Sequence, residues 1–137
     1  MAEFLDIQKI ERAFDALFSA NILTRDKGNQ EDLRYPIDKE DYISVCAEFT
    51  FNAFNIGLRE AAIYFEKAPK GSAVEQKRYQ FCQALLFYLD ERDKVPTLQH
   101  YCDLSSKSLG LLQHRIQEAT NYLKLALKAS QIPADEK

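Results

Sequence analysis

Glycine and proline are scarce in this sequence, with four of each among 137 residues. A sandwich of short strands needs many tight turns, and such turns depend heavily on these two residue types. The scarcity therefore argues against a turn-rich all-β fold. Hydrophobic residues at 46% and charged residues at 28% are ordinary for a globular protein, and the length suits a single domain.

Long hydrophobic runs are also missing. The longest uninterrupted apolar stretch covers residues 84–89, whereas a membrane-spanning helix needs about 20 consecutive apolar residues. The first residues, Met-Ala-Glu-Phe-Leu-Asp, show neither the basic leader nor the apolar stretch of a secretory signal. We therefore expect a soluble chain that makes no contact with a membrane.

Cysteine occurs only three times, at Cys46, Cys82 and Cys102, and the sequence contains no Cys-x-x-Cys pair. This spacing indicates neither a zinc knuckle nor a disulfide framework. Each cysteine falls on an apolar position of its segment, so we predict buried thiols in the core. Unpaired thiols are typical of a reducing compartment, and we place the chain in the cytoplasm.

Motifs that carry catalysis or hold cofactors are absent from the sequence. It has no glycine-rich phosphate loop, no G-x-S-x-G, no H-E-x-x-H and no Glu-x-x-His pair. The two histidines, His100 and His114, would lie about 21 Å apart along one helix, too far to share a metal ion. We therefore predict no catalytic, cofactor-binding or metal-binding residues.

Helical periodicity is the strongest positive signal in the sequence. Over residues 98–126, apolar side chains recur in alternating steps of four and three, and only a helix has that period. Pro96 is tolerated in the first turn and sets the start of a helix over residues 96–130. The cluster from Ser105 to Gly110 is where this helix could bend or break in two. The repeating positions are Leu98, Cys102, Ser105, Leu109, Leu112, Ile116, Ala119, Leu123 and Ala126.

A capping box marks the start of a second helix, over residues 72–93. Ser72 is followed three residues later by Glu75, and each side chain can satisfy the backbone N–H of the other residue. Residues 79–89 of this helix are almost entirely apolar. A narrow polar stripe, formed by Gln76, Gln80, Gln83 and Asp90, is the exception. A helix with so little polar surface hints at burial by a second copy of the chain.

Two further helices are expected, over residues 38–67 and 3–22. The first has an apolar side that includes Phe49 and Phe54, and acidic residues in its first turn oppose the helix dipole. Between these helices lies a polar loop, residues 23–37, whose length is typical of functional or mobile segments. We predict an all-α protein: an antiparallel bundle of about four helices in one domain, residues 1–132, followed by a disordered tail, residues 133–137.

Four apolar side chains are candidates for an interface. Phe87 lies on the polar stripe of the helix over residues 72–93. Tyr101, Tyr122 and Leu127 fall at the back of the helix over residues 96–130, opposite its apolar repeat, where they would face water in a monomer. If they converge, these four residues form one contact patch.

The leading functional hypothesis is a non-enzymatic protein-interaction, adaptor or assembly subunit, homo-oligomeric, that binds another protein or itself through helix faces. A second hypothesis is a small-ligand-binding protein or enzyme with a site under the loop over residues 23–37. A third is a weak nucleic-acid-binding accessory protein. The third is disfavoured because residues 97–131 carry only four basic against two acidic side chains, and the chain has a net charge of −3.

Overall fold

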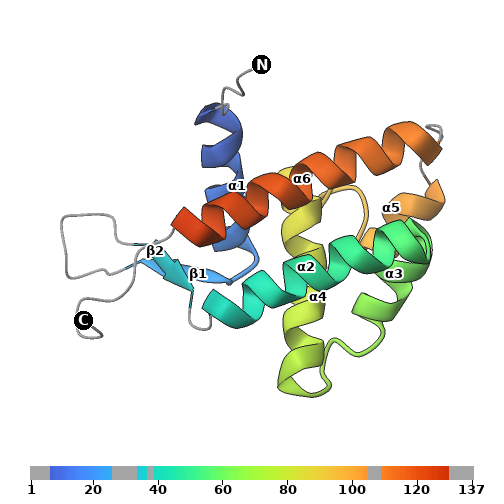
Figure 1. The fold of residues 1–137 in the computed structure, drawn as a ribbon, viewed down its shortest axis with the longest axis horizontal. Coiled ribbons are helices and arrows are strands. Elements are labelled where there is room, and N and C mark those ends of the chain that lie inside the picture. The colour runs from blue at the N-terminus through green and yellow to red at the C-terminus, as the bar shows by residue number, and fades with distance from the viewer. Residues whose placement is uncertain (1–6, 26–33, 37–38, 105–108, 130–137) are drawn as a thin grey trace.

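The computed structural model describes residues 7–25, 34–36, 39–104 and 109–129. Within these ranges the chain forms six helices and one two-stranded hairpin (Figure 1). The elements in chain order are α1 (Ile7–Ser19), β1 (Leu23–Arg25), β2 (Arg34–Pro36), α2 (Lys39–Asn55), α3 (Leu58–Glu66), α4 (Ala73–Tyr88), α5 (Leu98–Leu104) and α6 (Leu109–Ala129).

Helix α4 is the centre of the fold, since it contacts all five other helices. In Figure 1, α2 and α6 run across the molecule while α4 crosses behind them at a steep angle. Residues 81–86 and Tyr88 of α4 are buried as a result. The nearly complete apolar surface of this helix is thus covered within one chain, and it gives no reason to expect a second copy against α4.

The capping box at the start of α4 is confirmed. The Ser72 hydroxyl accepts a hydrogen bond from the Glu75 backbone N–H at 3.3 Å, and the Glu75 carboxylate accepts one from the Ser72 N–H at 2.9 Å. These contacts satisfy two of the backbone donors that a helix leaves unpaired at its amino end. A local signal of this kind depends only on neighbours in sequence, which is why it could be predicted.

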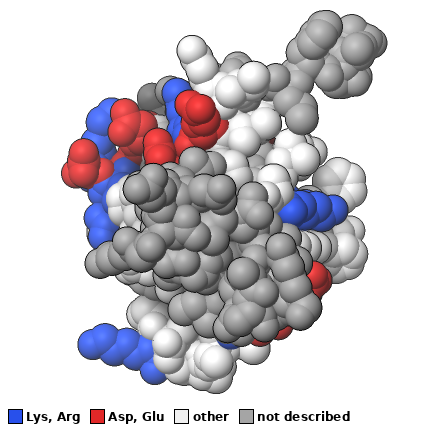
Figure 2. Space-filling model, turned by 90° about the vertical axis from the view of Figure 1, so that its left-hand side faces the viewer, with Lys and Arg blue, Asp and Glu red and all other residues white. Residues whose placement is uncertain are grey.

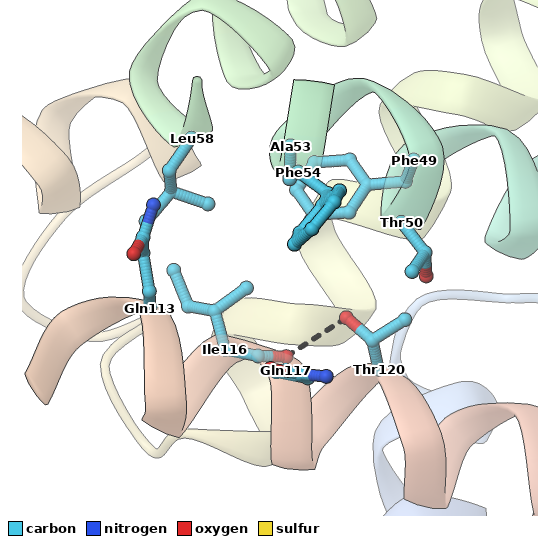
Figure 3. A pocket seen from close by; sticks show the side chains of 9 residues that line it. All are labelled: Phe49, Thr50, Ala53, Phe54, Leu58, Gln113, Ile116, Gln117 and Thr120. Carbon is cyan, nitrogen blue, oxygen red and sulfur yellow. Dashed lines mark hydrogen bonds between the residues drawn. The ribbon is translucent and has the colours of Figure 1, made fainter. Parts of the chain in front are cut away.

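The prediction of a single helix over residues 38–67 is wrong, because the chain turns between α2 and α3. Gly57 adopts φ +136°, a conformation that side-chain-bearing residues rarely reach. A Cβ atom at this position would also approach the Glu60 carboxylate oxygen to 2.3 Å. The break gives α3 its own direction and places Leu58, its first residue, beside α6 rather than along the axis of α2 (Figure 3).

The loop predicted over residues 23–37 contains a short β-hairpin, which corrects the expectation of an irregular connection. Strands β1 and β2 pair antiparallel, with Leu23 opposite Pro36 and Arg25 opposite Arg34. Each strand has only three residues, too few for an alternating pattern to be recognised in the sequence. Residues 26–33 and 37–38 lie outside the described part of the chain.

The helix predicted over residues 96–130 is also divided, into α5 and α6. Helix α5 ends at Leu104 and α6 begins at Leu109; residues 105–108, part of the serine and glycine cluster that the sequence marks as its weak point, lie outside the described ranges. The helix predicted over residues 3–22 corresponds to α1. Residues 1–6 and the predicted disordered tail, 133–137, are not among the described residues.

The helical fold class is confirmed, apart from the small hairpin, but the arrangement as four continuous antiparallel helices is not. An aromatic cluster holds three helices together at the core. The ring of Phe49 in α2 lies 5.1 Å from that of Phe65 in α3 and 5.6 Å from that of Phe81 in α4, centroid to centroid. Tilted and edge-on pairs at such distances stabilise a core beyond the area they bury.

None of the described helices combines the length and the apolar composition that crossing a bilayer requires.

Candidate binding site between α2 and α6

A cleft of about 340 Å³ opens between α2 and α6 (Figure 3). Its α2 wall is built from residues one turn apart, so that Phe49, Ala53 and Phe54 face α6. Leu58, at the start of α3, closes one end, because the chain has turned at Gly57. The full set of lining residues is Phe49, Thr50, Ala53, Phe54, Leu58, Gln113, Ile116, Gln117 and Thr120.

No charged or titratable side chain is among the nine described residues that line this cleft. Its two hydroxyl groups are already engaged: Thr50 donates to the Cys46 carbonyl at 3.1 Å, and Thr120 donates to the Ile116 carbonyl at 2.8 Å. A site that performs acid, base or nucleophilic chemistry needs groups that can move a proton or attack an atom. The described lining offers no ionisable side chain, and its two hydroxyl groups are held by backbone carbonyls.

Phe54 is the most unusual residue of the cleft, because this large apolar side chain on the rim is 88% exposed. Phe51, three residues earlier in α2 and outside the lining of the cleft, is 65% exposed. A single exposed apolar residue is normal on a protein surface, whereas two exposed aromatic residues within one helical turn are typical of a contact surface.

The opposite wall presents two amide groups from α6. Gln113 and Gln117 are both exposed, and neither side chain forms a hydrogen bond with a described residue. Amides at the edge of an apolar cleft can pair with polar groups of an incoming molecule and fix its orientation. The cleft therefore combines an apolar floor with adaptable hydrogen-bonding groups at its rim.

The three cysteine thiols are not activated for nucleophilic attack. Burial raises the pKa of Cys46 and that of Cys102 to about 12, and it raises the pKa of Cys82 well above its ordinary range. A reactive thiol needs the opposite shift, since the thiolate is the nucleophile. Cys46 instead donates its S–H toward the Thr120 carbonyl, 3.6 Å away, directly behind the cleft. All three thiols are free.

The two histidines lie on the surface. His100 Nδ1 lies 2.8 Å from the Thr97 hydroxyl oxygen at the start of α5. His114 lines a second, shallower depression with Gln117, Glu118, Asn121 and Tyr122. Within the described ranges, no three histidine, cysteine or acidic side chains are grouped so as to hold a metal ion.

Glu66 is an acidic side chain with a structural role that the sequence did not reveal. Its carboxylate, at the end of α3, accepts hydrogen bonds from the backbone N–H groups of Leu98 and Gln99 at 2.6 and 2.9 Å. It therefore caps the first turn of α5 from another helix. Burial raises the pKa of Glu66, and the two backbone hydrogen bonds oppose that shift in part.

Two of the four predicted interface residues are buried inside the fold, so the expectation that they face water is wrong. Tyr101 is 6% exposed and accepts a hydrogen bond from Arg115 at 2.8 Å, while Leu127 is completely buried. Both were placed on one continuous helix with one apolar side. In the structure Tyr101 belongs to the separate helix α5, and α6 is covered on two sides, by α1 and by α2.

The other two predicted interface residues are half-buried, in different surroundings. Phe87 packs against the core, with the Arg92 guanidinium 5.9 Å from its ring. Tyr122 stacks on Tyr88 with ring centroids 6.4 Å apart, and the Lys9 ammonium lies 5.8 Å from its ring. Because Tyr101 and Leu127 are buried, the four predicted interface residues do not form one exposed patch.

The residues that line the cleft were not predicted from the sequence as a binding site. Phe54 was counted with the apolar side of a continuous helix over residues 38–67, which predicts burial. The one signal available was Phe51, an aromatic residue between Glu48 and Asn55 on the polar side of the same helix. An aromatic ring among polar neighbours is a better indication of a contact surface than a ring within an apolar stripe.

Charges of both signs are intermixed on the side of the molecule shown in Figure 2, where described Lys and Arg side chains lie beside Asp and Glu. Among the described residues, ion pairs also join helices, such as Lys9 with Glu118 and Arg78 with Glu48. A basic surface available to phosphates would require Lys and Arg without acidic neighbours. That face therefore gives no support to the nucleic-acid hypothesis.

Comparisons with known proteins do not assign the chain to a family, since no family model, curated protein or solved structure matches it significantly.

Proposed function

We propose that this chain is a non-enzymatic protein-interaction module, and that the cleft between α2 and α6 is its docking surface. The observation that supports this proposal is an apolar cleft, free of charge among its described lining residues, with an aromatic ring 88% exposed on its rim. Exposing such a ring to water is unfavourable unless a partner covers it.

The cleft suits a protein partner that offers an apolar side chain from a helix or a short segment. Affinity at protein interfaces comes mainly from a few aromatic or aliphatic anchors that fill pockets, surrounded by groups that exclude water. Phe54 and the apolar floor provide such an anchor and such a pocket. Gln113 and Gln117 provide the polar rim that most interfaces have.

The rest of the proposal concerns assembly and location. We propose that the chain is homo-oligomeric and that it acts in the cytoplasm, which its three unpaired thiols favour. The alternative site under residues 23–37 finds no support in the described clefts, because none of their lining residues comes from that segment.

Selection of helical peptides from a displayed library tests the docking surface. We expect wild-type protein to select peptides that shift the amide NMR signals of residues 49–58 and 113–120. Phe54→Glu places a charge at the rim of the cleft and should weaken these peptides at least about ten-fold.

The matched control is Val74→Glu, which makes the same kind of change at a residue 50% exposed at the start of α4. It should bind the selected peptides as the wild type does. Peptides that bind Phe54→Glu and the wild type equally, or a selection that recovers no peptide dependent on this cleft, would contradict the proposal.

A further inference from the structure

We infer that the occupant of the cleft is a second copy of this chain, in a symmetric dimer in which the Phe54 ring of each copy enters the cleft of the other. This inference rests on the proposed function, because it uses the same docking surface and names the partner.

Self-complementarity is the first argument. In a two-fold symmetric dimer, the same surface of both copies is in contact, so that surface must fit itself. Here the exposed ring of Phe54 and the cleft between α2 and α6 belong to one surface, because Phe54 is itself one of the residues that line the cleft (Figure 3). A cleft of about 340 Å³ is large enough to hold a phenyl ring.

The absence of charge on the described lining is the second argument. In a two-fold symmetric contact, charged residues near the axis meet their own copies, and a surface whose charges all have one sign repels itself. The nine lining residues and Phe51 are all uncharged. Two copies can therefore approach through this surface without bringing like charges together at its centre.

The exposed apolar area supports a dimer and also determines how strong the dimer is expected to be. An aromatic side chain buries roughly 150–250 Å², so Phe51 and Phe54 at 65% and 88% exposure leave roughly 300 Å² of apolar surface per chain. Two copies contribute about twice that area before the cleft walls and the amide rim are counted. Stable specific interfaces bury about 1,200–2,000 Å² in total. We therefore expect a reversible dimer with a micromolar dissociation constant rather than an obligate one.

Sedimentation velocity over a range of micromolar to millimolar concentrations tests the dimer. Wild-type protein and Val74→Glu should show the same reversible monomer–dimer equilibrium. Phe54→Glu should weaken dimerisation at least about a hundred-fold, since each dimer loses two anchors worth about ten-fold each. Circular dichroism should be the same for all three proteins, because an exposed side chain contributes little to folding.

A mixing experiment tests the arrangement. Phe54→Ala removes the ring and leaves the other eight lining residues of the cleft in place, whereas Gln113→Trp fills the cleft from its exposed rim and keeps the ring. Each variant alone should be monomeric. Their mixture should form a heterodimer held by one of the two contacts, detected by native mass spectrometry with one chain isotope-labelled.

Two outcomes would overturn the inference. The first is a wild-type chain that stays monomeric at millimolar concentration; if cleft-dependent peptides are still selected, the proposed function stands and the partner is another protein. The second is a dimer that Phe54→Glu leaves unchanged, which would mean that the copies associate through a different face.

Discussion

Helix α4 and the carboxyl-terminal half of α2 are both rich in large apolar side chains, but the fold places them in opposite environments. Residues 81–86 of α4 are buried by contacts with five helices, whereas Phe51 and Phe54 of α2 remain largely exposed. From the sequence alone, α4 is the helix expected to bind a second copy, because it has little polar surface, whereas α2 shows an ordinary division into apolar and polar sides. An apolar helix thus indicates an interface only after its neighbours within the chain are known.

The largest difference between the two regions should appear when an aromatic ring is removed from each. Phe81→Ala deletes a fully buried ring that packs on Phe49, and we expect it to lower the free energy of unfolding by about 3–5 kcal/mol. Phe54→Ala should change it by less than about 0.5 kcal/mol. Urea unfolding at low protein concentration, where the chain is monomeric, measures both. Similar losses for both variants would show that α2 is packed more closely than the structure indicates.

A smaller difference is expected between two glutamines, Gln83 in α4 and Gln113 in the cleft. Gln83 is buried, donates to the Pro96 carbonyl at 2.9 Å and accepts from Arg92 at 2.5 Å, although the sequence placed it on a polar stripe. Replacing it with leucine leaves both partners without a hydrogen bond, at a cost of about 1–3 kcal/mol. Gln113→Leu should be nearly neutral for stability. Thermal and urea unfolding of the two variants provide the comparison, and a neutral Gln83→Leu would contradict this role.

The smallest expected effect concerns pH and the buried carboxylate of Glu66. Burial raises the pKa of Glu66 above its ordinary value of 4.5, so the folded chain holds this proton at pH values where the unfolded chain has lost it. The contribution of Glu66 to stability should therefore fall as the pH rises from 4.5 through the folded pKa, and level off above it. This burial distinguishes Glu66 from the exposed acidic residues at the start of α2.

The control for this effect is Glu66→Gln, which does not titrate and whose single amide oxygen can replace one of the two carboxylate oxygens that accept from the Leu98 and Gln99 N–H groups. The difference in unfolding free energy between wild type and Glu66→Gln, measured from about pH 4 to about pH 7, should shift in favour of the variant as the pH rises. A shift in the opposite direction would show that the two backbone hydrogen bonds outweigh burial.

Elements that depend on near neighbours could be predicted from the sequence. The capping box at Ser72 and Glu75 marks the start of α4 correctly, and the period of apolar residues identifies the helices. Helix α5 ends at Leu104, directly before the serine and glycine cluster that the sequence marks as the weak point of the last predicted helix. The break at Gly57 was missed because one glycine in a helical pattern is often tolerated, and only its φ of +136° shows that the chain turns there.

The candidate site could not be predicted in the same way, because its walls come from segments about sixty residues apart. Periodicity shows which side of a helix is apolar but not which neighbour covers that side. The sequence put Phe54 on the apolar side of its helix and Leu127 at the back of another, yet in the structure Leu127 is buried and Phe54 is exposed, because α6 is packed against both α1 and α2.

The sequence by itself determined that this chain is helical, where α4 begins, and that its thiols lie within apolar segments, because each of these depends on residues within a few turns of one another. Only the tertiary structure decided that α4 is the central helix, that Tyr101 and Leu127 are internal, and that a cleft opens beside Phe54. Burial is a property of contacts between distant segments, and the turn at Gly57 sets which segments meet.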